Sequence, residues 1–260
     1  MVQLLVAGSY TPTRIRSELT FPGAIATGAT GLKVKRVQEW LTLHDCALAI
    51  DSDFGPVTEL QVRSFQAQVG IAVTGAVDNT TWDHLVEPLV KAVAPIAPGA
   101  TLSSTINAVA AQHVAQHPRE AGGDNRGPWV RAYLGWDGTP ARWCAGFTCT
   151  AMEQAAAIHG VAPAIASSAS CDTLADRAKA ANRFVAGGGA NTPPAKTIPP
   201  GSFFLVRATA TDWTHVGIVA GAGPAAFQTL EGNTNDEGSP DGYEACARAR
   251  NYRNKDFIVW

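Results

Sequence analysis

A cysteine at a predicted helix start is the first candidate for chemistry in this sequence of 260 residues. The segment GTPARWCAGFTCTAMEQAAAIHG predicts a turn and then a helix that begins close to Cys144 and ends before Gly160. A thiol at the N-terminus of a helix faces unpaired backbone N–H groups and the positive end of the helix dipole. Both favour the thiolate, which is the nucleophilic form of cysteine. Cys149 is expected to face another direction and to pack as a small apolar residue.

His215 is the candidate base for this thiol. A nucleophilic cysteine needs a neighbouring group that takes up and returns a proton during acyl transfer. His215 opens the apolar segment HVGIVAG, so we expect it at the rim of a sheet while Val216, Ile218 and Val219 are buried. A histidine at a strand edge is often only a hydrogen-bonded surface residue. The interpretation therefore depends on its pairing with Cys144.

Glu231 and Asn233 are the candidates for orienting the imidazole. A catalytic histidine needs an acceptor that selects its tautomer and stabilises the imidazolium. Both residues end the predicted strand AAFQTLEGN, and residues two apart on a strand point to the same face. Antiparallel pairing with the strand of His215 would place that face over the imidazole. Glu231 alone would be an ordinary surface carboxylate, and Asn233 makes the pattern more specific.

The oxyanion of an acyl-transfer intermediate requires hydrogen-bond donors aimed at it. The backbone N–H of Cys144 is the first candidate. A second comes from the stretch GGDNRGPWV, in which Asn125 or Arg126 would reach the site from upstream. The alternative for this stretch is a turn formed by Asp124, Asn125 and Gly127.

Two tryptophans next to the catalytic candidates are the candidates for binding a substrate. Trp143 precedes Cys144, and Trp213 lies two positions before His215. Each would wall a groove for a glycan or a stem peptide. The alternative is that both belong to the hydrophobic core, where aromatic side chains are more common.

A helix followed by several strands must position these side chains. The segment INAVAAQHVAQH predicts a helix, and residues 186–200 have the glycine and proline content of a surface loop. The following runs SFFLVRA, HVGIVAG and AAFQTLEG are rich in β-branched and aromatic residues and predict strands. This order indicates an α+β fold with an antiparallel sheet.

The first half of the chain has a different pattern, with three short amphipathic helices. LKVKRVQEWL, TELQVRSFQAQVG and VTGAVDNTTWDHL carry apolar residues at helical spacing, and the turn DSDFGP places Pro56 in the first turn of the second helix. Residues 31–88 thereby resemble the peptidoglycan-binding type 1 domain, a small three-helix fold. Ser52 departs from the family pattern, which usually has Gly there, and Thr74 stands where Asp is common.

This resemblance implies that the domain binds peptidoglycan, with Asp53 and Phe54 of the turn as contact candidates. The alternative is that Asp53, Phe54, Gly55 and Thr58 only cap and staple a helix.

The remaining segments complete the expected domain organisation. Residues 1–30 combine Thr, Ser, Pro and Gly with short apolar pieces and predict an extended arm. Residues 89–104 are rich in Pro and Ala, which predicts a semi-rigid linker. Residues 105–260 form the second domain.

The order Cys144, His215, Glu231 and Asn233, with WCAGF, PPGSFFLV, THVGIV and LEGNTN around it, resembles the cysteine, histidine-dependent amidohydrolase/peptidase (CHAP) domain. The resemblance covers residues 105–260. It implies a papain-like α+β fold that cleaves amide bonds in peptidoglycan. Cys144 would be the nucleophile and His215 the general base and acid. Glu231 would orient His215, and Asn233 would complete the polar group around it.

Some CHAP domains bind calcium through acidic residues upstream of the cysteine. Only Asp124 and Asp137 are available for this here, too few for an oxygen cage, so we expect no metal and no other cofactor.

Composition limits the partners and the setting. A hydrophobic content of 46% supports packed cores, and a net charge of −2 leaves no broad basic surface for nucleic acid or anionic lipid. No stretch approaches the roughly 20 apolar residues of a membrane helix. The first basic residue, Arg14, follows the short apolar run at the N-terminus, which is the wrong order for a secretory signal. We expect a protein made in the cytoplasm without a signal peptide that acts in the periplasm or cell wall after release or delivery.

The five cysteines have no CxxC and no regular spacing, which argues against a zinc site and against a dense disulfide framework. An odd count leaves at least one thiol free within the chain. The sequence leaves open whether a single disulfide forms, for example between Cys171 and Cys246.

The expected function is hydrolysis of an amide bond of peptidoglycan by thiol catalysis. The bond lies either within the stem peptide, which we favour slightly, or between muramic acid and L-alanine. A phage endolysin, acting as a monomer, is the first interpretation. The alternatives are an antibacterial effector with the same chemistry, a catalytically silent wall-binding protein, and a thiol peptidase of the NlpC type, which usually has His as its third polar residue.

Overall fold

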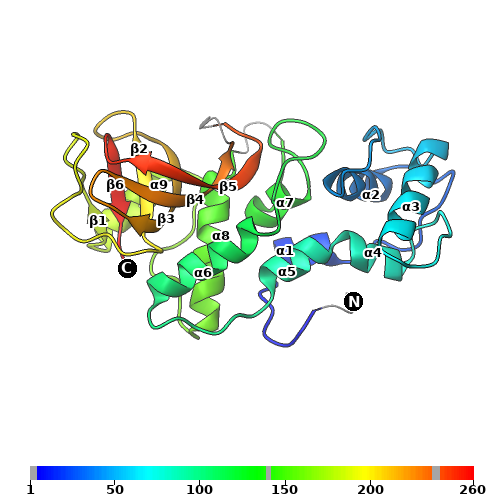
Figure 1. The fold of residues 1–260 in the computed structure, drawn as a ribbon, viewed down its shortest axis with the longest axis horizontal. Coiled ribbons are helices and arrows are strands. Elements are labelled where there is room, and N and C mark those ends of the chain that lie inside the picture. The colour runs from blue at the N-terminus through cyan, green and yellow to red at the C-terminus, as the bar shows by residue number, and fades with distance from the viewer. Residues whose placement is uncertain (1–4, 139–141, 236–240) are drawn as a thin grey trace. The chain divides into compact units, whose positions relative to one another are not determined.

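The structure is a computed structural model that describes residues 5–138, 142–235 and 241–260 (Figure 1). The chain divides into two compact units. Unit 1 comprises Met1–Ala94 and Arg119–Thr139, and unit 2 comprises Pro95–Pro118 and Pro140–Trp260. Each unit is described below by itself.

Within the described ranges the chain is α+β, with nine helices and a sheet of six strands. The helices of unit 1 are α1 (Thr13–Leu19), α2 (Leu32–Leu43), α3 (Pro56–Gln68), α4 (Asn79–Leu85), α5 (Glu87–Val93) and α7 (Pro128–Leu134). The helices of unit 2 are α6 (Leu102–Val114), α8 (Cys144–Ile158) and α9 (Cys171–Ala180). The strands are β1 (Phe184–Val185), β2 (Phe203–Arg207), β3 (Trp213–Ala222), β4 (Ala226–Thr234), β5 (Glu244–Asn251) and β6 (Lys255–Ile258).

Helices α2, α3 and α4 surround an aromatic core in unit 1. Trp40, Phe54, Phe65 and Trp82 are fully buried. Each of the three helices contributes one of its faces, as the helical spacing of apolar residues predicts. Leu32, at the start of α2, lies off this face and is 79% exposed.

A buried glutamine holds the turn that precedes α3. The Gln38 side-chain amide donates to Asp51 Oδ1 at 2.7 Å and to the Asp53 carbonyl at 3.0 Å, and its oxygen accepts from the Ser52 N–H at 2.8 Å. Ser52 has a φ of 68°, in the left-handed region that favours glycine. The preference of the resembled family for Gly at this position therefore follows from the turn itself, and Ser52 adopts the same backbone conformation.

In the part of the N-terminal segment that the structure describes, residues 5–30, the chain is not an extended arm, which corrects the expectation from the sequence. Helix α1 buries Ile15 and Leu19, and the indole N–H of Trp82 donates to the Leu19 carbonyl at 2.9 Å. Ile25 forms an antiparallel bridge with Val77. This segment contains only a few apolar residues, and they lie close together in the sequence. Their burial therefore depends on contacts with residues far along the chain.

The expected linker and domain boundary also differ from the structure. Helix α5 extends to Val93, and α6 already begins at Leu102 behind a capping box formed by Thr101 and Ser104. The segment with α7, which the sequence assigned to the second domain, belongs to unit 1. Arg131 of α7 links this segment to the rest of unit 1, because it forms ion pairs with acidic side chains of α1 and α2.

The six strands of unit 2 form one antiparallel sheet with the order β1-β6-β2-β3-β4-β5. Helix α8 packs against β3 and β4 and also against α6, while α9 contacts β3 and β1 (Figure 1). An apolar cluster that includes Phe204, Phe227 and Phe257 forms part of the core of the sheet. The approach of α8 to β4 is close, because a Cβ atom added at Gly232 would lie 2.6 Å from Cβ of Phe147.

Candidate functional site

Cys144 is the first residue of α8, as the sequence predicts. The residue is 3% exposed, and its side chain lies at the helix end that carries the positive dipole. Its backbone N–H makes no hydrogen bond to any part of the chain that the structure describes, as is usual in a first helical turn.

His215 presents one ring nitrogen to a carboxylate and the other to the thiol. Its Nε2 lies 2.9 Å from Oε2 of Glu231. Its Nδ1 has no hydrogen-bond partner among the described residues, and the interaction of the imidazole with the Cys144 thiol raises the pKa of His215. A proton on Nε2 is held by Glu231, so Nδ1 carries the lone pair that accepts a proton from sulfur.

Glu231 is fully buried and accepts hydrogen bonds from three side chains. In addition to His215, the Thr229 hydroxyl donates to Oε1 at 2.5 Å. Arg250 donates from Nε to Oε1 at 2.8 Å and from Nη2 to Oε2 at 2.6 Å. The sequence analysis missed Arg250, because its position on β5 is brought to Glu231 only by the pairing of β4 with β5.

The charges of this cluster favour a thiolate–imidazolium pair. The contacts with Cys171 and His215 hold the pKa of the Cys144 thiol well below its usual value, although burial opposes this. Burial alone would lower the pKa of His215, but Cys144 and Glu231 outweigh it and raise that pKa to about 9. Burial favours the neutral form of Glu231, yet Arg250 and His215 lower the pKa of this carboxyl to about 2. The site therefore holds a nucleophile and an acid at neutral pH.

Cys171 is a second thiol at the site, and the sequence analysis did not assign it. It is the first residue of α9, and its interaction with Cys144 lowers the pKa of the Cys144 thiol. All five cysteines are free thiols, so the open pairing of Cys171 with Cys246 is absent from the structure.

Asn233 lies at the site but contacts the start of α8 instead of His215. Its Oδ1 accepts from the Trp143 N–H at 2.9 Å, and its Nδ2 donates to the Gly242 carbonyl at 2.7 Å. The expectation that Asn233 and Glu231 share a strand face is wrong, because β4 has an irregularity between Glu231 and Thr234 and Asn233 has a φ of 55°. Asn233 anchors the residue that immediately precedes the nucleophile.

The tryptophans proposed as groove walls are core residues, which is a correction. Trp143 is fully buried, and its ring would lie 2.9 Å from a Cβ added at Gly232. Trp213 is 5% exposed. Its indole N–H donates to Asp256 Oδ2 at 2.8 Å, and the Lys179 ammonium lies 4.5 Å from the ring centroid. Neither ring offers a face to a polymer.

Phe54 and Asp53, the two candidate peptidoglycan contacts in unit 1, have different outcomes in the structure. Phe54 is fully buried in the helical core, so its predicted contact with peptidoglycan is wrong. Asp53 is exposed, while its backbone carbonyl accepts from the side chains of Gln38 and Thr58. The backbone of Asp53 thus shapes the turn, and its carboxylate remains a candidate contact.

Asn125 belongs to unit 1 and lies in a turn. Its N–H donates to Glu120 Oε2 at 2.8 Å, and its carbonyl accepts from the Gly138 N–H at 2.7 Å. The Arg126 N–H donates to the Gly123 carbonyl at 3.2 Å, which closes the turn. This stretch therefore forms a turn, which was the alternative expectation from the sequence.

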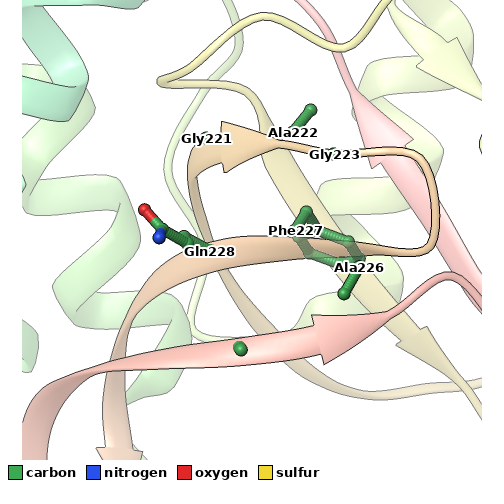
Figure 2. Close-up of a pocket in the computed structure, with 7 residues that line it drawn as sticks. Gly221, Ala222, Gly223, Ala226, Phe227 and Gln228 are labelled. Carbon is green, nitrogen blue, oxygen red and sulfur yellow. The ribbon is translucent and has the colours of Figure 1, made fainter.

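An open hollow of about 480 Å³ lies on the β3–β4 hairpin and is lined by Gly221, Ala222, Gly223, Ala226, Phe227, Gln228 and Ala249 (Figure 2). It is at the opposite end of β3 from His215. Its lining contains no titratable or nucleophilic side chain, so it has no groups for the chemistry expected here.

No group of three or more His, Cys, Asp or Glu side chains within the described residues is arranged to hold a metal ion. None of the helices in the part of the chain that the structure describes is long and apolar enough to cross a membrane.

Comparison with known proteins identifies one domain in the first half of the chain. Residues 30–85 match the family PG_binding_1, a peptidoglycan binding domain, so the chain contains a domain of this family. No curated protein matches the chain.

Three solved structures are similar to parts of this chain. A peptidoglycan-binding protein from Clostridioides difficile is 38% identical over 25% of this chain and 42% of its own, with a TM-score of 0.25. The N-terminal domain of SleB is 30% identical over 25% of this chain and 92% of its own, with a TM-score of 0.25. A fused Zn-dependent amidase/peptidase/peptidoglycan-binding domain-containing protein from Clostridium acetobutylicum is 28% identical over 35% of this chain and 43% of its own, with a TM-score of 0.25. The chain thus spans less than half of the first of these proteins.

Arg250 gives a direct test of how the site is held. In Arg250→Met, Glu231 loses two charge-assisted hydrogen bonds, and the pKa of its carboxyl rises from about 2. Glu231 then stabilises the imidazolium less, and if the site performs acyl transfer on peptidoglycan, we expect kcat/KM to fall about ten- to a hundredfold, with activity lost at a higher pH on the acid side. Turbidity assays on isolated sacculi across pH measure both effects. Arg250→Lys keeps the charge and should recover part of the loss, whereas an unchanged profile in both variants would contradict this role.

Proposed function

We propose that unit 2 is a thiol hydrolase that cleaves an amide bond of peptidoglycan, with the papain-like fold of the CHAP domains. One observation carries the proposal. The thiol of Cys144, at the start of α8, interacts with His215, and Nε2 of His215 lies 2.9 Å from the Glu231 carboxylate. A nucleophile, a base and an orienting carboxylate in this order are the minimum for covalent acyl transfer.

The proposed reaction begins with attack of the Cys144 thiolate on the amide carbonyl carbon. The backbone N–H of Cys144 is the first donor to the resulting oxyanion. As the tetrahedral intermediate collapses, the C–N bond breaks and His215 gives its Nδ1 proton to the leaving amine. A water molecule then attacks the thioester, with neutral His215 as the base, and the acyl group leaves as a carboxylic acid. Glu231 stabilises the imidazolium throughout.

The domain at residues 30–85 supports peptidoglycan as the substrate. A module that binds the wall raises the concentration of bonds available to a linked catalytic unit without adding any contact to the bond itself.

The finer proposal is a stem-peptide endopeptidase or an N-acetylmuramoyl-L-alanine amidase of a phage endolysin. Mass spectrometry of fragments released from defined peptidoglycan tests it. Newly exposed amines within the stem support the endopeptidase, and free lactyl groups on muramic acid support the amidase. If the purified chain binds sacculi but releases neither fragment, it is a wall-binding protein and the hydrolase proposal fails. Two results together would instead favour a delivered effector. Expression of the chain alone would lyse the cells, and co-expression of a cognate immunity protein would prevent that lysis.

The charge pair predicts a bell-shaped dependence of kcat/KM on pH. On the acid side activity rises as the Cys144 thiol ionises, and this occurs early because the pKa of that thiol is lowered by Cys171 and His215. On the alkaline side activity falls as the imidazolium loses its proton, because the pKa of His215 is raised to about 9. The alkylation rate of Cys144 by iodoacetamide, followed against pH, should show the early ionisation. A single ionisation near the usual thiol pKa would contradict the ion pair.

A further inference from the structure

We propose that Tyr243 is a substrate-binding residue at the mouth of the Cys144 site, where its ring packs against the part of peptidoglycan that flanks the scissile amide. This role rests on the proposed hydrolase function and names a residue that holds its substrate. Trp143 and Trp213 are buried, so neither supplies such a contact. Among the described residues of unit 2, Tyr243 is the one strongly exposed aromatic side chain, at 55%.

A single amide side chain connects the segment of Tyr243 with the nucleophile. Oδ1 of Asn233 accepts from the N–H of Trp143, the residue directly before Cys144, at 2.9 Å. Nδ2 of the same amide donates to the carbonyl of Gly242, the residue directly before Tyr243, at 2.7 Å. The residues that precede Cys144 and Tyr243 thus occupy the two ends of one small side chain, so the two backbone segments are neighbours.

An ion pair joins the same two segments. Nη2 of Arg142 lies 3.4 Å from Oδ2 of Asp241. These residues stand two positions before Cys144 and Tyr243, respectively. Both charged side chains are about half exposed, so the pair contributes little to stability. It is nevertheless independent of Asn233 and gives the same alignment of the two segments.

The backbone that carries Tyr243 is fixed on both sides. Before it, the Gly242 N–H donates to the Asn233 carbonyl at 3.2 Å, and a Cβ atom added at Gly242 would collide with the backbone of Thr234. After it, Glu244 pairs with Thr234 at the end of β4. A tyrosine on a fixed backbone has only two side-chain torsions to lose, so its ring buries a large area at a small entropic cost.

The chemistry of the exposed ring indicates the kind of surface it binds. The side chain of Tyr243 has no hydrogen bond or ring contact to any other residue that the structure describes. A tyrosine ring offers two apolar faces and a hydroxyl that both donates and accepts. A matching ligand has an aliphatic C–H surface bordered by polar groups. Peptidoglycan has such surfaces on the sugar rings of its glycan strand and on the alanine residues of its stem peptide.

Fluorine NMR tests the contact without any need for hydrolysis. The chain has four tyrosines, so incorporation of 3-fluorotyrosine gives four signals, and the signal that is missing in Tyr243→Phe belongs to Tyr243. In Cys144→Ala, which leaves the substrate intact, we expect soluble peptidoglycan fragments to shift this signal. The signals of the buried Tyr133 and Tyr252 are internal controls and should not move.

Two smaller probes identify which part of peptidoglycan meets the ring. Free stem peptide and peptide-free glycan oligomers are added separately to the labelled chain. The probe that shifts the Tyr243 signal is the part that the ring contacts. A Tyr243 signal that stays in place with both probes and with the intact fragments would overturn the proposal.

Cleavage kinetics provide a second readout. In Tyr243→Ala we expect KM for soluble peptidoglycan fragments to rise about ten- to a hundredfold, as the loss of one aromatic contact predicts, while kcat stays near its native value. Tyr243→Phe keeps the ring and should recover most of this loss. Val161→Ala is the matched control, because Val161 is 53% exposed in unit 2 and lies just beyond the far end of α8. Its KM should not change.

The two readouts separate a failure of the contact from a failure of the hydrolase function. Cleavage with a native KM in Tyr243→Ala would defeat the contact and leave the hydrolase in place. A Tyr243 signal that shifts in a chain whose native form releases no fragments would keep the contact and defeat the hydrolase function instead.

Discussion

Cys144→Ala is expected to lower kcat/KM for peptidoglycan cleavage by about 10⁴-fold or more, because the substitution removes the sulfur that attacks the amide carbonyl carbon. His215 and Glu231 remain in place but then have no nucleophile to activate. The release of soluble fragments from isolated sacculi measures the loss. Binding to the same sacculi should be unchanged, because residues 30–85 belong to unit 1 and do not include Cys144.

Cys46→Ala is the matched control for this substitution. Cys46 is a half-buried free thiol of unit 1, and its sulfur makes only a weak contact of 3.9 Å with the His44 carbonyl. We expect full cleavage activity in this variant. If Cys144→Ala kept most of the native activity, the nucleophile would have to be sought elsewhere in the chain.

Arg131→Met is expected to have the largest effect on stability, with a loss of about 3 kcal/mol from unit 1. The guanidinium lies 2.9 Å from Glu18, 2.7 Å from Glu39 and 2.7 Å from Asp137. Glu39 is fully buried and Glu18 is 4% exposed, so methionine would leave two desolvated carboxylates without their main partner. Lys35 and Arg36 also pair with them, which limits the loss.

Hydrogen exchange locates this effect within the chain. In Arg131→Met the amides of α2 and α7 should exchange faster, while those of the sheet in unit 2 should keep their protection. Lys91→Met removes an exposed ion pair with Glu87 on α5 and serves as the control, with no expected change in exchange. Equal protection of α2 and α7 in the native chain and in Arg131→Met would show that the three ion pairs do not hold unit 1 together.

Local patterns in the sequence were enough to predict the parts of the site that depend on a single element. The start of α8 at Cys144 follows from a turn, a helical run and a glycine stop within one segment. The burial of Val216 and Ile218 follows from the apolar run that His215 opens. Such features depend on residues within a few positions of each other, so their signal is present in the sequence itself.

The errors occur where a residue's role depends on the geometry of two elements together. Asn233 was expected to join Glu231 above His215, but the left-handed backbone at Asn233 turns its side chain to the start of α8. Trp143 was expected at a surface, but β4 passes so close to α8 at Gly232 that the ring is enclosed. A strand irregularity and a close approach of two elements leave no periodic pattern in the sequence.

The amino-acid sequence by itself determined which elements carry the thiol, the imidazole and the carboxylate, and that residues 30–85 have the pattern of a wall-binding domain. Only the tertiary structure decided that Arg250 and Cys171 belong to the same site, and that Arg131 joins α7 to α1 and α2. The physical reason is that periodicity and caps act over a few residues, whereas charges and thiols pair across any separation in the chain. Their partners are therefore selected by strand register and by the packing of helices.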